Sequence, residues 1–317
     1  MRNTGLIEEP PHRVGRGEYR GQRAGGISVL VGAALLIFCV PAFPQDAPLD
    51  TNISAGELLR RAVDGELKAQ AADHSHWMYE VNENISGRKQ VKVVVETREG
   101  DLARFRSVNG QPLTTEEQKQ EERRINRLLH QADEQEKRHR AQQEDGRQKD
   151  HLFKILPDAV LARYGERKGD LVEILFRPNP DFRPSSREDV VFHAMAGRIW
   201  IDEKQNRLAE IEGHLDKDVK FMGGLLGYLN KGGEFHVRQS EVAPGHWEVT
   251  LLHVNMHGKV LFFKTIAVQQ NESRSNFQRA PDDLSLAEAA EELQRQCITQ
   301  TNAKSNGSLK ASGASAR

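Results

Sequence analysis

Histidines are the residues of this chain whose type most readily suggests chemistry, because imidazole binds transition metals and exchanges protons near neutral pH. Four of them gather in the last third of the sequence: His236, His246, His253 and His257. Their spacings match no zinc-binding pattern, and the sequence contains no His-Glu-x-x-His motif. The alternation along residues 247–254 places His253 on the side of the apolar residues, which predicts that it points inward. We interpret the four as surface or core histidines and predict no metal ligand.

Serines and carboxylates give no pattern typical of a hydrolase. The sequence has no Gly-x-Ser-x-Gly elbow, no Walker loop and no Rossmann glycine pattern. Ser185 and Ser186 follow a proline in a predicted loop, and no neighbour marks either as activated. Asp202 and Glu203 lie where a predicted strand enters a turn, a place where Asp is common for turn geometry alone. The sequence therefore predicts no catalytic residue, no cofactor and no enzyme; a hydrolase with an unfamiliar site would need an acid, base or metal converging in one cavity.

A glycine-rich apolar segment, FMGGLLGYLNKGG at 221–233, is the most distinctive irregular stretch. Large apolar side chains stand there on a flexible backbone: Phe221, Met222, Leu225, Leu226, Tyr228 and Leu229. One interpretation is a loop or short helix that folds back and plugs one end of the predicted barrel. The other is a mobile gate or hook that contacts a ligand or a membrane.

Eight aromatic residues could line an apolar cavity, because a pocket for an acyl chain needs little beyond apolar walls. They are Trp77, Tyr79, Phe105, Phe176, Trp200, Phe235, Trp247 and Phe262. The same residues could be ordinary core, and the sequence does not separate these two interpretations.

The composition excludes some classes of function. The formal net charge of the 317 residues is -1, so bulk charge indicates neither nucleic acid nor an anionic membrane as a partner. The two cysteines are Cys39 and Cys297. Cys39 lies in the N-terminal apolar run, and removal of that run would leave one thiol and no internal disulfide.

The start of the chain has the pattern of an export signal. A leader rich in arginine precedes 14 uncharged residues at 27–40, and Pro41 ends the run. A helix that spans a bilayer needs about 20 residues, so this run is typical of a signal peptide. We predict a signal segment at 1–44, cleaved after Ala42 or slightly later, or retained as an anchor. Lipidation of Cys39 is disfavoured by the bulky residues before it. The expected location is the periplasm or cell envelope, with a linker at 45–52.

The elements that must position these residues are helices and many short strands. Ser54 and Glu57 form a capping pattern that begins a helix over about 54–71. Strand alternation appears three times between 77 and 107. The segment 114–150 is dominated by charged residues three and four apart, which predicts a long solvated helix. An apolar helical pattern at 151–164 is expected to be split by Pro157.

Seven more strands are predicted after residue 169, with a tight hairpin at 255–258. Their expected ranges are 171–176, 190–195, 198–202, 207–215, 235–242, 247–254 and 259–268. A short helix at 284–297 is expected within a largely disordered tail at 280–317. The predicted fold class is α+β. It is a strongly curved antiparallel sheet or half-barrel of about ten strands covered by helices, in one domain at 53–279 with the charged insertion at 114–150.

This order of elements resembles the LolA/LolB-like superfamily of bacterial lipoprotein-localisation carriers. The segment GRIWIDEKQNRLAEIEG at 197–213 looks like members that sort outer-membrane lipoproteins. The stretches RPNPDFRPSSRED, LLGYLNKGGEF, EVAPGHWEVT and GKVLFFKTI also resemble uncharacterised exported proteins of soil bacteria. The resemblance covers about 52–277, and the charged insertion departs from the small carriers. It implies a sheet covered by helices that encloses an apolar cavity.

The predicted function is that of a periplasmic or envelope protein that binds an apolar ligand, an acyl chain or a lipoprotein, in a covered cavity. The alternative is a structural or interaction module with a filled barrel, which docks an envelope protein through the charged helix. Membrane contact is compatible with both, and nucleic acid is not an expected partner.

Overall fold

The computed structural model describes residues 53–221, 227–260 and 264–296. The predicted signal segment and linker, the last residues from 297 onward, and Met222, Leu225, Leu226 and Phe262 lie outside these ranges. Within the described ranges, no helix combines the length and the apolar character needed to cross a membrane.

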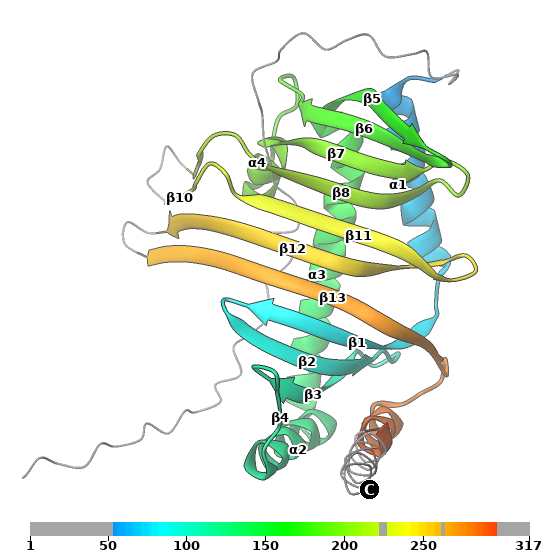
Figure 1. Cartoon of the computed structure of the whole chain (residues 1–317), viewed down its shortest axis with the longest axis vertical. Coiled ribbons are helices and arrows are strands. Elements are labelled where there is room, and N and C mark those ends of the chain that lie inside the picture. Colours follow the sequence, from blue (N-terminus) through cyan, green and yellow to red (C-terminus); the bar gives the residue numbers. More distant parts are fainter. Residues whose placement is uncertain (1–52, 222–226, 261–263, 297–317) are drawn as a thin grey trace, which may run out of the picture.

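One antiparallel sheet forms the body of the protein (Figure 1). It has 13 strands in the order β4-β3-β2-β1-β13-β12-β11-β8-β7-β6-β5, with β10 paired to β12 and β9 paired to β10, and it is not closed. The strands are β1 (His76–Ile85), β2 (Arg88–Val95), β3 (Leu102–Val108), β4 (Gln111–Pro112), β5 (Val160–Lys168), β6 (Leu171–Pro178), β7 (Met195–Asp202), β8 (Arg207–Leu215), β9 (Val219–Phe221), β10 (Gly227–Leu229), β11 (Glu234–Ala243), β12 (His246–Val260) and β13 (Lys264–Ala280). The prediction of a mixed fold with a large antiparallel sheet is confirmed.

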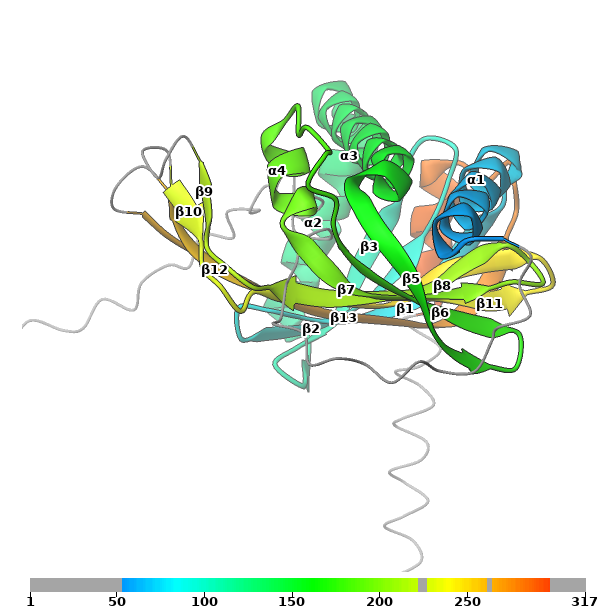
Figure 2. The ribbon, with the colours of Figure 1, turned by 90° about the horizontal axis from the view of Figure 1, so that it is seen from above.

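Helices pack on this sheet, and Figure 2 shows α1, α3 and α4 on the same side of it. The helices are α1 (Ala55–Ala72), α2 (Thr115–His130), α3 (Ala132–Ala159), α4 (Arg187–His193) and a last helix at 286–296. The Ser54 hydroxyl accepts the Glu57 N–H, as the capping pattern predicts.

The main core fills the space between α1, the end of α3 and the sheet. Leu58 and Leu59 of α1 and Leu156 of α3 pack there against alternating residues of β6 and β7, such as Ile174 and Ile199. Side chains on a strand alternate between faces, so these residues mark the side of the sheet that the helices cover.

Two smaller clusters lie on opposite sides of β1. Met78 packs with Ile125 of α2 and Leu293 of the last helix, whereas its neighbour Tyr79 packs with Trp77 and Val94. The helix at 286–296 therefore belongs to the folded body, which extends past residue 279, where the sequence pattern placed its end.

Four predicted elements are wrong in detail. The charged segment 114–150 is not one long helix, because α2 ends at His130, Gln131 is extended, and α3 begins at Ala132. The pattern at 151–164 is not two short helices, because α3 continues through Pro157 to Ala159 and residues 160–164 begin β5. Pro157 lies two residues before the end of α3, so the backbone hydrogen bond that it removes belongs to the last turn and the helix before it is kept. Residues 190–195 are not one strand, because α4 takes residues up to His193. A helix forms here in place of a strand because the side chains of Ser186 and Asp189 form a reciprocal capping box at its start.

The hairpin predicted at 255–258 is also absent from the described chain. These residues continue β12 and pair with residues 266–269 of β13. The asparagine and glycine of the sequence NMHG are therefore part of a long strand and do not form a turn.

Candidate functional site

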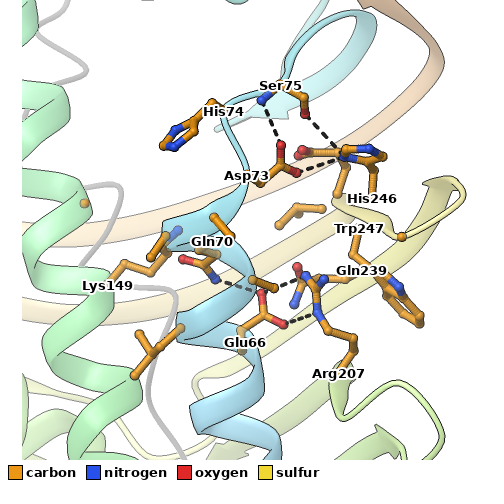
Figure 3. A pocket seen from close by; sticks show the side chains of 18 of the residues that line it. Glu66, Gln70, Asp73, His74, Ser75, Lys149, Arg207, Gln239, His246 and Trp247 are labelled. Atoms are coloured by element: carbon orange, nitrogen blue, oxygen red, sulfur yellow. Dashed lines mark hydrogen bonds and ion pairs between the residues drawn. The ribbon is translucent and has the colours of Figure 1, made fainter.

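A cleft of about 830 Å³ opens where the C-terminal end of α1 meets α3 and the hairpin between β11 and β12 (Figure 3). We call it the α1 cleft. Most of its lining residues are polar or charged, and they include Glu66, Gln70, Asp73, Lys149, Arg207, His246, Trp247 and Glu248. The cleft is therefore suited to a ligand that carries hydrogen-bonding or charged groups.

A buried ion pair lies at one wall of the α1 cleft. Arg207 donates from Nε and an Nη to the two carboxylate oxygens of Glu66, at 2.9 and 3.3 Å. The Gln70 amide donates to the same carboxylate at 2.7 Å. Gly65 allows this approach, because a Cβ there would lie 2.4 Å from the carbonyl oxygen of Asn206. The close contact between α1 and the turn before β8 thus places the pair.

A second polar group surrounds His246 at the rim of the cleft. Asp73 Oδ2 lies 3.0 Å and Ser75 Oγ 3.5 Å from the same ring nitrogen, Nδ1. Ser75 also accepts the Trp77 indole N–H at 2.8 Å. In a Ser-His-Asp triad the serine and the aspartate bond opposite ring nitrogens. These contacts fix the rim and do not activate Ser75 as a nucleophile.

Burial raises the pKa of Asp73, but hydrogen bonds from Ser75 and the interaction with His246 outweigh it. The resulting pKa lies below the ordinary value. Asp73 is therefore charged at neutral pH and holds the imidazole in place.

Two carboxyl groups, Glu96 and Glu248, interact with each other, and Glu248 lines the cleft. Glu96 accepts the Trp77 backbone N–H at 3.0 Å. Burial raises its pKa to about 8, with the negative charges of Glu248 and Asp101 adding to the effect. Burial also raises the pKa of Glu248, which lines the cleft itself. Glu96, which is not part of the cleft lining, therefore holds a proton near neutral pH.

An adjoining cleft of about 570 Å³ shares part of this lining. It includes Asp73, His74 and Ser75 together with Thr97 and Arg98. The segment 73–75 is therefore common to both openings.

The predicted aromatic residues are distributed over the whole fold. Trp247 lines the α1 cleft, donates its indole N–H to Gln205 at 3.0 Å and lies 5.6 Å from the Arg207 guanidinium. Trp77 belongs to the cluster on β1 with Tyr79, and its ring also lies 5.6 Å from the His246 ring at the rim of the cleft. The other described ones are elsewhere: Phe176 and Phe235 in the main core, Trp200 beneath Lys168, and Phe105 beneath Arg124. The structure brings Trp77 and Tyr79 into one cluster and does not gather the set into one cavity.

The glycine-rich segment is β-structure in the parts that the structure describes. Phe221 ends β9 and pairs with Gly227, and Tyr228 and Leu229 belong to β10, which pairs with β12. Phe221 and Leu229 pack against the main core. Figure 2 shows β9, β10 and the adjoining end of β12 projecting beyond α4.

The prediction that His253 points inward is wrong. Its neighbours Leu252 and Val254 belong to the main core, so alternation places His253 on the opposite face of the sheet. There it contacts the side chains of Asn271 and Glu234. Arg238 and Gln239 of β11 pair with Leu251 and Val249 of β12, so Thr250 is an extra residue on β12 that shifts the alternation assumed from the sequence.

The serines and the carboxylate pair considered in the sequence have structural contacts. Ser185 donates its hydroxyl to Asp189 at 2.6 Å, and Ser186 caps α4. Asp189 also contacts His151, at 2.8 Å. Asp202 accepts the Gln205 N–H at 2.8 Å, which is a turn contact.

Sequence reasoning missed Glu66 and Arg207. A signal for Glu66 existed, because it is a charged residue on the apolar stripe of α1 formed by residues 58, 59, 62 and 63. No comparable signal marks Arg207, whose partner lies 141 positions away.

The fold and the cleft define a mixed α/β protein built on one open antiparallel sheet, with a polar cleft at the end of its first helix. In comparisons with known proteins, no family model matches the chain, and no curated protein is significantly similar to it. The resemblance to the LolA/LolB-like superfamily stays a prediction.

Proposed function

We propose that this protein is an exported binding protein of the periplasm or cell envelope, and that it holds a polar small molecule in the α1 cleft without transforming it. The observation that carries the proposal is the cleft of about 830 Å³ with its fixed charged lining. Clefts of several hundred Å³ with a few oriented polar groups are typical of ligand sites.

The lining favours a polar ligand over the apolar one expected from the sequence. Phe176 and Phe235, two of the expected cavity residues, are packed in the main core between the helices and the sheet. An acyl chain needs apolar walls, whereas the walls of the α1 cleft include Lys149, Glu248 and the Glu66–Arg207 pair. A strongly curved sheet, a half-barrel around α1 and α3, is part of this proposal because curvature would bring the β11–β12 hairpin towards α1.

Hydrogen bonds within the cleft favour binding over catalysis. Asp73 and Ser75 contact the same nitrogen of His246, and the Arg207 guanidinium donates its hydrogen bond to the Glu66 carboxylate. These groups are positioned by one another, which suits recognition of a ligand by a rigid surface.

A glycine in α3 offers a direct test. Gly146 lines the cleft, and a Cβ there would meet no heavy atom within 4 Å, so Gly146→Phe fills the cleft without a clash at the backbone. Gly56 of α1 is also open at its Cβ and is not part of the cleft lining, so Gly56→Phe is the matched control.

The measurement is a thermal-shift screen of small polar compounds, followed by calorimetry of those that bind. We expect compounds that raise the unfolding midpoint of the native protein and of Gly56→Phe but not of Gly146→Phe. Native mass spectrometry of protein purified from the periplasm is the second measurement. Acyl lipids as the sole bound species would contradict the proposal and support the apolar ligand.

A second candidate function, docking of an envelope protein, is favoured by the exposed charged stretch of α3. Its ion pairs connect residues of the same helix: Arg140 with Glu136 and Arg147 with Glu144. All four side chains are more than 60% exposed. Exchanging the charges within both pairs keeps an intrahelical attraction of a few tenths of a kcal/mol, about the same as before, and reverses the outward charge pattern. Loss of a cross-linked partner in that variant, with an unchanged unfolding midpoint, would support docking.

A further inference from the structure

Three potential metal ligands converge on the side of the sheet opposite the main core. Glu210 and Glu212 stand two positions apart on β8, and His236 on β11 is the register partner of Glu212. One ligand atom from each residue lies within 4.8 Å of the other two. The intervening Ile211 and the neighbouring Val237 pack against the main core, so alternation places all three ligands on the other face.

Neighbouring side chains orient these ligands. The His236 Nε2 atom lies 2.6 Å from Glu210 Oε1, and Arg238 Nε donates to the second oxygen of Glu210 at 3.0 Å. Arg198 forms an ion pair with Glu212 Oε1. Each carboxylate is thus held by an arginine, in the manner of the outer contacts that orient metal ligands. The arginines also offset the repulsion between the two carboxylates.

We propose that Glu210, Glu212 and His236 bind one divalent transition-metal ion, with Zn²⁺ as the expected species. Zinc bonds to imidazole nitrogen and carboxylate oxygen are about 2.0–2.2 Å long, so two ligands at a tetrahedral angle lie about 3.4 Å apart. The ion would replace the direct contact of 2.6 Å between His236 Nε2 and Glu210 Oε1, so these two atoms must move apart by about 0.8 Å. A water molecule completes the coordination, because the three side chains are 21–23% exposed. The imidazole favours a transition metal over Mg²⁺ or Ca²⁺, which prefer oxygen ligands.

The test is calorimetric titration of tag-free, chelator-treated protein with Zn²⁺. We expect one ion per chain, no comparable signal with Mg²⁺, and a loss of affinity of at least about tenfold in both Glu212→Gln and His236→Gln. His257→Gln is the matched control, because His257 lies on β12, contacts Gln269, and is not one of the three converging residues.

Circular dichroism without metal checks that each variant is folded. Zinc affinity that is the same in the native protein, His236→Gln and His257→Gln overturns the proposal, as does the absence of binding to the native protein. The three ligands are separate from the α1 cleft, so Gly146→Phe is expected to bind Zn²⁺ normally. The two proposals therefore stand or fail independently.

Discussion

Arg207 of β8 and Glu66 of α1 are joined by two hydrogen bonds of 2.9 and 3.3 Å, although 141 positions separate them in the sequence. Both side chains are buried, at 9% and 1% exposure. This contact attaches the first helix to the sheet at the wall of the α1 cleft, so the shape of the cleft depends on it.

Removing one member of this pair is expected to destabilise the protein strongly. Arg207→Met leaves the Glu66 carboxylate buried without its main partner, which typically costs about 3–5 kcal/mol. The double variant Glu66→Leu/Arg207→Met should recover most of this loss, because no buried charge then remains unpaired. The measurement is the free energy of unfolding in urea. The control is Arg140→Ala in the exposed pair with Glu136, where a change below about 0.5 kcal/mol is expected. Equal losses in the single and double variants would show that the unpaired charge of Glu66 is not the cause of the destabilisation.

The carboxyl group of Glu96 should make stability depend on pH. Its pKa rises from 4.5 to about 8 on folding, so the folded state binds the proton more tightly than the unfolded state. The stability that the folded state gains from this proton is fully present below pH 4.5 and is lost as the pH rises through 8. Glu96→Gln keeps an acceptor for the Trp77 N–H and does not lose this stability. The difference in unfolding free energy between Glu96→Gln and the native protein should therefore grow as the pH rises from about 5 to about 8, and level off by about pH 9.

We expect the gain to be about 1–2 kcal/mol, because partial exposure of Glu96 reduces the full effect of the shift. The measurement is the unfolding free energy of both proteins at several pH values. Glu136→Gln on the exposed surface of α3 is the control and should show no such trend. A constant difference between native protein and Glu96→Gln across this range would refute the prediction.

Two glycines of α1 should respond to alanine in opposite directions. At Gly65 a Cβ would lie 2.4 Å from the Asn206 carbonyl oxygen, so Gly65→Ala must displace the helix or the turn. We expect a loss of about 1–3 kcal/mol. At Gly56 nothing lies within 4 Å, and Gly56→Ala should stabilise the helix by up to about 1 kcal/mol. Chemical denaturation measures both, and a neutral Gly65→Ala would show that the close contact is not required.

The start of α4 should depend on its capping box. Ser186→Ala removes the hydroxyl that accepts the Asp189 N–H at 3.0 Å, and we expect a loss of about 1 kcal/mol. Ser54→Ala at the start of α1 removes an equivalent contact and should cost a similar amount. Unfolding in urea gives both values. No loss in Ser186→Ala would show that packing of Val191 and Phe192 alone forms this helix.

The sequence alone predicted the elements whose signals are local. Alternation of apolar and polar residues indicated an antiparallel sheet, and Ser54 with Glu57 marked the start of α1, because side chains two to four positions apart report the backbone period directly. Local signals failed where two of them competed: Pro157 suggested a break that α3 does not make, and the apolar run at 190–195 hid the capping box of α4.

The tertiary structure alone decided the candidate site. Asp73 and His246 are 173 positions apart, and Glu66 reaches Arg207 because α1 contacts the turn before β8 closely at Gly65. Likewise His236 meets Glu210 and Glu212 because β11 pairs with β8 and not with the intervening β9 or β10. Strand order and helix docking are set by burial of the whole core, so no short stretch of the sequence records which polar side chains they bring together.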